Sequence, residues 1–233
     1  MMQDINKNIL VTASSHGLGY AIAKEFSQNG YGVIIHGRNA DNINQAKEDL
    51  DNVICTVQGD LRDEGTIDRL VEASDLHDIS VLVNSAAIPC YGIPLAEMGQ
   101  KQIMNSLQTN LVAPIILTNR LYSTIVRNSP GSIININSVV GVEPKIFRSV
   151  HSATKWGLRG FSKSLRLEAS ADGIKVINVY PSRVMTVPEF EYGLEPSYVA
   201  TRIYEEFDNY SGKGELLIDG RPEEFRPKEK YYV

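Results

Sequence analysis

The chain has 233 residues, of which 42% are hydrophobic and 22% are charged, as is ordinary for a globular protein with one sizeable core. Its net charge of −5 at pH 7 gives no electrostatic reason to expect nucleic acid or an anionic membrane surface as a partner. No apolar run approaches the roughly 20 residues that span a bilayer. The first residues, MMQDINKN, have no apolar signal core, so we expect a cytoplasmic protein.

Short β-branched apolar runs alternate with longer amphipathic stretches along the chain. The runs predict strands at 8–12, 32–36, 52–57, 79–84, 132–137, 175–180 and 215–219. The stretches predict helices over roughly 17–29, 41–50, 63–74, 100–128, 151–171 and 196–208. The strands are almost continuously apolar, as is typical where helices cover both faces of a sheet. We therefore predict an α/β fold of three layers, doubly wound, with about seven parallel strands and helices on both faces.

Two glycines, Gly17 and Gly19, lie in the segment VTASSHGLGYAIA between the first predicted strand and the first predicted helix. Backbone amides at such a turn, together with the positive end of the helix dipole, form a seat for a diphosphate. Glycine suits the turn because a Cβ would hold the phosphates away. An ordinary tight turn has the same composition, but the position after the first strand of a doubly wound pattern favours a dinucleotide site. The pattern thus predicts one Rossmann-type nucleotide-binding domain over 1–233, with a polar tail at 221–233.

The end of the second predicted strand, IIHGRN, bears on which dinucleotide is bound. An acidic residue at this point usually binds the adenosine ribose hydroxyls. Gly37 and Arg38 stand there instead: glycine leaves room for a 2′-phosphate, and a guanidinium can bind it through paired hydrogen bonds. His16 is placed to help from the phosphate turn. We therefore expect NADP(H) in preference to NAD(H); the alternative is that Arg38 is a solvated loop charge.

Asp60 follows the third predicted strand in the segment QGDL. Its carboxylate can accept a hydrogen bond from the adenine amino group, or it can cap the helix that follows. The two roles are compatible.

The order and spacing of these segments resemble the short-chain dehydrogenase/reductase superfamily over nearly the whole chain. TASSHGLG (12–19) looks like the TGxxxGxG turn of that family with alanine for its first glycine, and NSAA (84–87) looks like its NNAG segment. PSRVMT (181–186) resembles its PGxVxT segment, and HSATK (151–155) matches YxxxK with histidine in place of the tyrosine. The resemblance implies an NAD(P)-dependent oxidoreductase.

The resemblance also implies the site residues, motif by motif. The cofactor-binding residues that it implies, together with those argued above, are Thr12, Ser14, Ser15, His16, Gly17, Leu18, Gly19, Gly37, Arg38, Asp60, Leu61, Asn84, Ser85, Ala86, Lys155, Pro181, Ser182 and Val184. The catalytic residues that it implies are Ser138, His151, Lys155 and Asn110. We expect no metal site, because Cys55 and Cys90 form no metal-binding pattern.

In the family, as the resemblance implies, the tyrosine exchanges a proton with the substrate oxygen while a hydride moves to or from the nicotinamide ring. Lys155 lies four residues after position 151, on the same helix face, where it would favour a phenolate and bond the nicotinamide ribose. Ser138 would hold the substrate oxygen, and Asn110 would anchor a water linked to the lysine.

Histidine at position 151 changes this chemistry. We expect the ammonium of Lys155 to lower the pKa of His151, so that the neutral ring acts as a base, which suits alcohol oxidation better than carbonyl reduction. The imidazole also ends short of the place of a phenol oxygen, so direct transfer needs a closer substrate or a bridging water. The alternative is a structural His151, hydrogen-bonded to Ser138 or to the backbone.

Two other features bear on the reaction. Tyr91, Tyr192 or Tyr198 could take the place of the missing tyrosine, since all three flank segments at the carboxyl edge of the sheet. The segment VPEFEYGLE (187–195) is short where family members commonly carry a longer lid, which predicts an open site, a bulky substrate, cover by a partner chain, or no substrate.

Two further hypotheses stand beside an NADP(H)-dependent oxidoreductase acting on a hydroxyl or carbonyl group of an unidentified small molecule. One is a catalytically weakened, nucleotide-binding subunit that supports or regulates an active relative. The other is a non-redox activity in which His151 is a general base and the nucleotide is structural.

The resemblance also implies an oligomer: a homodimer or homotetramer, or a hetero-oligomer with a related subunit, formed through the long helices at 100–128 and 151–171. Their apolar residues serve that interface or face their own sheet. These residues are Ile116, Leu117, Leu121, Trp156, Leu158 and Phe161.

Overall fold

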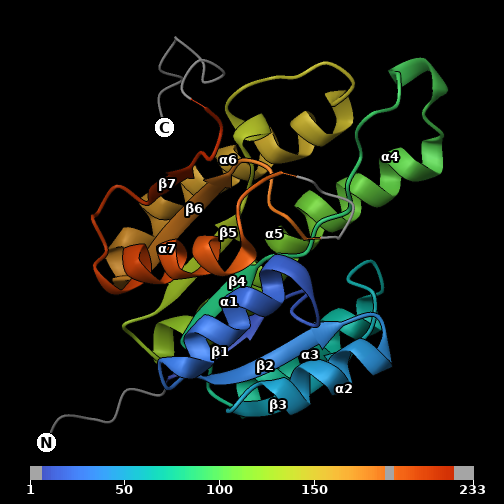
Figure 1. Cartoon of the computed structure of the whole chain (residues 1–233). Coiled ribbons are helices and arrows are strands. Elements are labelled where there is room, and N and C mark those ends of the chain that lie inside the picture. Colours follow the sequence, from blue (N-terminus) through green and yellow to red (C-terminus); the bar gives the residue numbers. More distant parts are fainter. Residues whose placement is uncertain (1–6, 187–191, 223–233) are drawn as a thin grey trace, which may run out of the picture.

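Seven parallel strands, one for each predicted run, form one sheet in the computed structural model, which describes residues 7–186 and 192–222 (Figure 1). They are β1 (Asn8–Val11), β2 (Gly32–Gly37), β3 (Val53–Gln58), β4 (Val81–Asn84), β5 (Ser132–Ile136), β6 (Lys175–Pro181) and β7 (Glu215–Ile218). The predicted α/β, doubly wound fold is confirmed. Local alternation of apolar runs was sufficient to locate each strand because the helices between them carry a different period.

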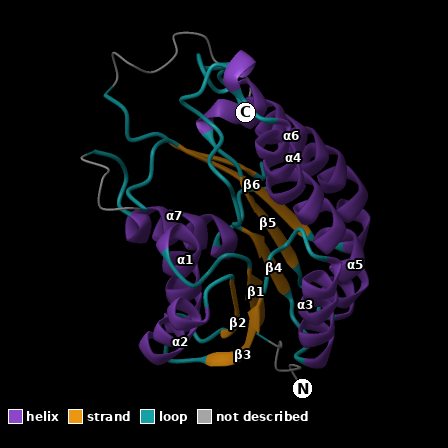
Figure 2. Ribbon diagram, turned by 90° about the vertical axis from the view of Figure 1, so that its right-hand side faces the viewer, coloured by secondary structure: helices purple, strands orange, loops and turns teal. Residues whose placement is uncertain are grey.

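Helices cover both faces of this sheet, in three layers. They are α1 (Gly17–Gln28), α2 (Ala40–Asp49), α3 (Glu64–Leu76), α4 (Gln100–Leu107), α5 (Ala113–Arg127), α6 (Ser149–Ala169) and α7 (Pro196–Asp208). Figure 2 shows α1, α2 and α7 on one side of the strands and α3, α4, α5 and α6 on the other. Among the described residues, no helix combines the length and the apolar character that crossing a membrane requires.

The predicted helix over 100–128 is one continuous helical segment with an irregular middle. A π-helical turn, Gln108–Val112, joins α4 to α5. Such a turn adds a residue to the helix and is frequent at functional sites. Short single-turn helices lie at Leu95–Glu97, Val139–Gly141 and Ser170–Asp172.

The strands supply two cores, one on each face of the sheet. In β1, Ile9 and Val11 pack with α1, α2 and α7, whereas Leu10 packs with α3 and α5 on the other side. Side chains alternate between faces along a strand, so a strand covered on both faces must be apolar at every position. Each large aliphatic side chain that is fully buried contributes roughly 1.5–3 kcal/mol relative to an exposed one.

The strands lie in the order β3-β2-β1-β4-β5-β6-β7. Successive strands of the chain are added toward one edge of the sheet from β1 to β3 and toward the other edge from β4 to β7, so the order reverses between β1 and β4. In open parallel sheets, ligands bind at the carboxyl edge next to such a reversal, because the connecting loops diverge there and leave a crevice. The loops after β1, β2, β4, β5 and β6 are therefore brought to one place.

Candidate active site

The turn between β1 and α1 adopts a backbone that glycine favours at two points. Ala13 has φ of 53°, a left-handed conformation that costs a residue with a side chain about 1–2 kcal/mol. Gly17 has φ of 62°. Gly19 is required for a different reason: a Cβ there would overlap the carbonyl oxygen of Ala13. The turn thus has the close backbone approach that the predicted diphosphate seat needs.

The buried histidine of β2, His36, holds this turn in place, a role that sequence reasoning missed. The backbone amide of Ala13 donates to His36 Nδ1 at 3.0 Å, and His36 Nε2 lies 3.1 Å from the carbonyl oxygen of Gly59, after β3. Burial lowers the pKa of His36 to about 4, so the ring is neutral at pH 7. A single polar ring inside the apolar run GVIIHG was the signal that could have revealed it.

The first turn of α1 has the properties of an anion seat. His16 occupies the position before the helix without a side-chain hydrogen bond to the helix amides, and no acidic residue lies in the first turn. Gly17, Leu18 and Gly19 line the adjacent cleft. Unpartnered amides and the positive helix end favour a phosphate group here, so these residues fit a dinucleotide.

A cleft of about 730 Å³ follows the carboxyl edge of the sheet from this turn to the segment after β6. A smaller hollow of about 90 Å³ adjoins it at the end of β2. Most of the predicted cofactor residues line one or both spaces: Ser15, His16, Gly17, Leu18, Gly19, Gly37, Arg38, Asp60, Leu61, Ser85, Ala86, Lys155, Pro181, Ser182 and Val184.

Three predicted cofactor residues lie behind the cleft wall. The Thr12 hydroxyl accepts hydrogen bonds from the amides of Ser85 and Ala86, at 2.9 and 3.1 Å, and so joins β1 to the loop after β4. Ser14 accepts from the amide of His36 at 3.0 Å. Asn84 is buried and donates to Asn135 on β5 at 2.8 Å. All three are buried, and their side chains position the loops that line the cleft.

At the end of β2, Arg38 is exposed and lines both spaces. Its side chain forms no ion pair with a carboxylate among residues 7–186 and 192–222. Gly37 differs from expectation, because the space a Cβ would take is already filled by Ser15 Oγ, 2.6 Å from that position. Glycine at 37 therefore admits the phosphate turn, rather than a 2′-phosphate directly.

Asp60 does not cap the next helix. Its carboxylate accepts hydrogen bonds from the Arg62 guanidinium, from Nη2 to Oδ2 at 2.6 Å and from Nε to Oδ1 at 2.9 Å. This hydrogen bonding lowers the pKa of Asp60 to about 2. Asp63 is the cap of α3 and accepts from the amide of Thr66 at 3.0 Å. An acid three residues before an apolar repeat was the local signal for that cap.

Ser138, His151 and Lys155 line the same cleft. Lys155 is buried and donates from Nζ to the carbonyl oxygen of Ile136 at 2.9 Å, and burial lowers its pKa to about 8. The pKa of His151 is lowered to about 4, by burial first and by Lys155 and Arg148 second. The low pKa that we expected for His151 is present, but burial lowers it more than the charge of Lys155 does.

The His151 ring forms no hydrogen bond with Ser138 or with the backbone of any described residue. Its Nδ1 is buried and has no hydrogen-bond partner in the described part of the chain. The ring meets Tyr91 edge to face, with centroids 5.9 Å apart. Because Nδ1 is buried, exchange of a proton with a group bound in the cleft would fall to the other ring nitrogen, Nε2.

Asn137, which sequence reasoning did not single out, connects Ser138 with Lys155. Its Oδ1 accepts from the amide of Ser138 at 2.9 Å, and its Nδ2 donates to the carbonyl oxygen of Lys155 at 3.0 Å. The loop after β5 and helix α6 are thereby held in register at the site.

Asn110 lies in the π-helical turn and is fully buried. Its side chain pairs with the backbone of Ile88, accepting from the amide at 2.7 Å and donating to the carbonyl oxygen at 3.0 Å. Nδ2 also donates to Ser106 at 3.2 Å. The side chain therefore holds the loop after β4, and it does not line the cleft.

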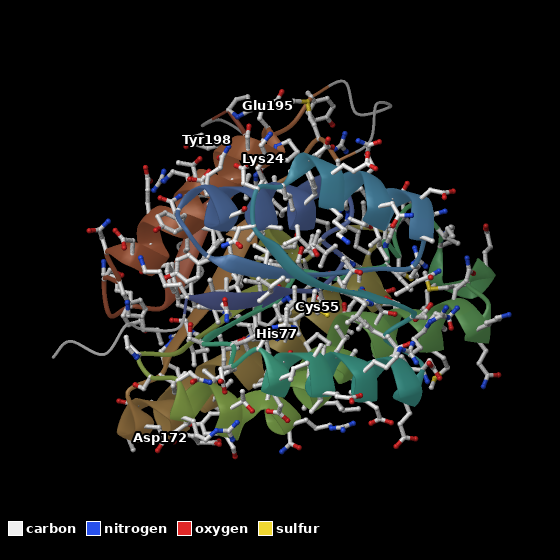
Figure 3. The ribbon with its side chains drawn as sticks, turned by 90° about the horizontal axis from the view of Figure 1, so that it is seen from below. Lys24, Cys55, His77, Asp172, Glu195 and Tyr198 are labelled. Carbon is white, nitrogen blue, oxygen red and sulfur yellow. The ribbon has the colours of Figure 1, made fainter. Side chains whose placement is uncertain are left out.

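The three alternative tyrosines are placed differently. Tyr91 and Tyr192 line the cleft, the latter under the guanidinium of Arg183 at 4.3 Å. Tyr198 lies on α7, close to Arg202 and away from the cleft; Figure 3 labels it there. Two of the three therefore reach the candidate site.

The chain just before the predicted short lid segment, 187–195, is held to the end of that segment by backbone contacts. Val184 pairs with Leu194, and the amide of Met185 donates to the carbonyl oxygen of Leu194 at 2.9 Å. α7 begins at Pro196, as predicted. Residues 187–191 of this segment and 223–233 of the predicted tail lie outside the described residues.

Comparison with known proteins places this geometry in context. The profile of the family described as short chain dehydrogenase matches residues 7–191. The chain is similar to an oxidoreductase of Staphylococcus epidermidis, with 30% identity over 182 residues that cover 77% of this chain and 79% of the relative. It is also similar to an NADP-dependent 3-hydroxy acid dehydrogenase of Salmonella typhimurium, with 30% identity over 178 residues, 76% of this chain and 72% of the relative.

Among solved structures, the chain resembles a metagenomic short-chain oxidoreductase in complex with NADP. The TM-score is 0.80 at 24% identity, and the match covers 93% of this chain and 98% of the other. At this identity the likeness bears on the fold, which it supports over almost the full length of both chains.

Proposed function

Because this chain belongs to the short chain dehydrogenase family and is an NAD(P)-dependent oxidoreductase, we propose that it uses NADP(H) to interconvert a hydroxyl and a carbonyl group on a small molecule, with His151 exchanging the proton. One observation carries the proposal: a single cleft joins an uncapped helix start, an exposed arginine at the end of β2, and the group Ser138, His151 and Lys155. The similar proteins support it, since they are named as oxidoreductases, and nothing in their names favours a non-catalytic subunit.

The residues that would hold the cofactor are distributed along this cleft. The amides of Gly17, Leu18 and Gly19 would bind the diphosphate, and Arg38 would bind a 2′-phosphate. Lys155 would bond the nicotinamide ribose. When bound, the nicotinamide supplies hydride transfer to or from the substrate carbon.

The protonation state of His151 sets which reaction, alcohol oxidation or ketone reduction, is faster near neutral pH. With a pKa of about 4, His151 is neutral at pH 7, so the form that can accept a proton from an alcohol is abundant and the form that can give one to a ketone is scarce. Ser138 would hold the substrate oxygen beside it. We therefore expect alcohol oxidation to be the faster reaction at pH 7, and ketone reduction to accelerate as the pH falls toward 5.

Replacement of His151 tests its role. We expect His151→Ala to lower kcat by roughly 10²–10⁴-fold, the usual contribution of a general acid–base, while the Kd for NADPH stays within a factor of about two. His151→Tyr should raise ketone reduction at pH 7, because a phenol beside Lys155 is a proton donor at that pH. Steady-state kinetics and NADPH fluorescence titration measure both quantities.

The matched control is His77→Ala, at the end of α3 (labelled in Figure 3), which does not line the cleft and should leave turnover unchanged. Unaltered activity of His151→Ala would refute the role. If His151→Ala keeps some activity and the added change Tyr91→Phe abolishes it, Tyr91 is the residue that exchanges the proton.

Cofactor preference is tested at Arg38. Arg38→Ala should weaken NADPH binding by about 30-fold, since a charge-assisted guanidinium–phosphate pair is lost, and should leave NADH binding nearly unchanged. Lys47→Ala, an exposed cation on α2, is the control. Equal loss of both cofactors in isothermal titration calorimetry would contradict the assignment of the 2′-phosphate to Arg38.

A further inference from the structure

The part of the cleft beyond His151 gathers positive charge. Lys145 and Arg148, from the connection between β5 and α6, line it together with Arg183 and Arg221. No aspartate or glutamate among the described residues lines the cleft. The charged side chains that line this part of the cleft are thus all positive, although the chain as a whole has a net charge of −5.

These four cations have different surroundings. Arg221 is already neutralised, with Glu143 and Asp219 each 2.8 Å from its guanidinium nitrogens. Lys145 and Arg148 form no ion pair with a carboxylate in the described part of the chain. Two positive charges of the wall are therefore available to an incoming group.

Arg148 is held in position by an aromatic ring. Its guanidinium carbon lies 4.5 Å from the centroid of the Tyr91 ring, and that ring in turn meets His151. A guanidinium stacked on a ring keeps its N–H donors in its own plane, where they can bind two oxygens at once. The Tyr91 ring thus contacts both Arg148 and His151, which places an anion-binding guanidinium near the group proposed to exchange the proton.

The cations also disfavour one another. Burial lowers the pKa of Lys145, and the charges of Arg221 and Arg148 lower it further, against the opposite effect of Glu143 and Asp219. Arg148 likewise acts against protonation of His151. A bound anion would relieve this repulsion, so the wall is electrostatically complementary to negative charge.

The cofactor's own phosphates do not account for these residues. The diphosphate seat lies after β1 and the candidate 2′-phosphate site after β2, whereas Lys145 and Arg148 follow β5, on the other side of the sheet's reversal point. The negative charge that they complement is therefore not that of the cofactor's phosphates.

We propose that the substrate carries an anionic group, which Arg148 and Lys145 bind while its hydroxyl or carbonyl group lies at His151. The inference rests on the proposed function and adds the substrate class to it. A carboxylate and a phosphate share the chemistry that this wall recognises, and the experiment separates them.

The test compares pairs of probes, one member with an anionic group and one without. One pair is 3-hydroxybutyrate and its neutral methyl ester; the other is glycerol 3-phosphate and glycerol. Wild type, Arg148→Gln, Lys145→Gln and the double variant are each saturated with NADP⁺, and kcat/KM and the shift in Tm are measured with every probe. Lys24→Gln, an exposed lysine on α1 (Figure 3), is the matched control.

We expect wild type to prefer the charged member of at least one pair, and the pair that responds identifies carboxylate or phosphate. Arg148→Gln and Lys145→Gln should each raise KM for that probe by about 10- to 100-fold, with the Kd for NADP⁺ and the kcat/KM of the neutral probe within about threefold of wild type. Arg148→Lys should restore part of the loss.

Equal kcat/KM for charged and neutral probes, or variants that retain wild-type KM, would overturn the proposal. If NADP⁺ does not bind, the proposed function fails instead. If NADP⁺ binds but no probe is turned over, the Tm decides: an anion-dependent rise that the double variant lacks supports the site, and its absence in wild type overturns it.

Discussion

His36 shows how one buried ring can set the shape of the turn between β1 and α1. It accepts the amide of Ala13, whose φ of 53° is unfavourable for alanine, and it contacts the carbonyl oxygen of Gly59 through its other nitrogen. Both contacts require a neutral ring with one donor and one acceptor. The strain at Ala13 is thus compensated by a hydrogen bond from another strand.

Stability should fall on mild acidification because of His36 and His151. Both have a pKa of about 4 in the folded chain, below the value of about 6.5 in an unfolded one. Between these values the unfolded chain binds more protons, so the stabilisation is full above about pH 6.5 and is lost as the pH falls toward 4. Each histidine should lower the free energy of unfolding by roughly 2 kcal/mol between pH 7.5 and pH 5.

Urea unfolding at these two pH values measures this loss. His36→Gln removes one of the two groups, so the difference between the two pH values should shrink by about half, although the variant is less stable at pH 7.5. A wild-type free energy of unfolding that is the same at both values would contradict the assignment.

At the scale of elements, α5 and α6 divide their apolar residues between two faces. Leu117 and Leu121 are buried in the core on one face of the chain's own sheet, and Leu158 is also buried within the chain. Ile116 and Trp156 are 41% and 43% exposed. The periodicity of a helix predicts that both faces exist, but only the packing of each helix decides which residue belongs to which.

We expect the exposed faces of α5 and α6 to associate with a second subunit. Ile116→Glu combined with Trp156→Glu should convert an oligomer to a monomer in light scattering, because two buried charges would face the partner. The Tm at high dilution should change little, since neither side chain is buried in the single chain. Leu76→Glu, at a 75% exposed position on α3, is the control, and an unchanged mass of the double variant would contradict the prediction.

The π-helical turn between α4 and α5 illustrates a limit of periodicity. The predicted helix over 100–128 is present, but the added residue turns Asn110 inward to the backbone of Ile88. The resemblance in sequence predicted this asparagine at the catalytic site, but it does not line the cleft. Its contact with a loop 22 residues earlier depends on a distortion that the apolar repeat does not record.

At the scale of the whole molecule, the sheet order brings loops from distant parts of the chain to one cleft. Segments near residues 13–19, 38, 85, 138–155 and 181–186 meet there because the strands are parallel, so their carboxyl ends share one edge, and because the order of strands in the sheet reverses between β1 and β4. The cleft wall is positive although the chain is acidic, because carboxylates such as Glu143 and Asp219 are paired with Arg221 beside it.

The sequence by itself determined the seven strands, the helices between them and the glycine turn after the first strand. These features depend on neighbouring residues, whose apolar period and turn chemistry are local. Only the tertiary structure decided that His36 supports the turn, that Asp60 pairs with Arg62, that Thr12, Ser14 and Asn84 lie behind the wall, and that Lys145 and Arg148 face the cleft. Burial and side-chain partners arise from contacts between segments far apart in the chain, and a local pattern carries no record of them.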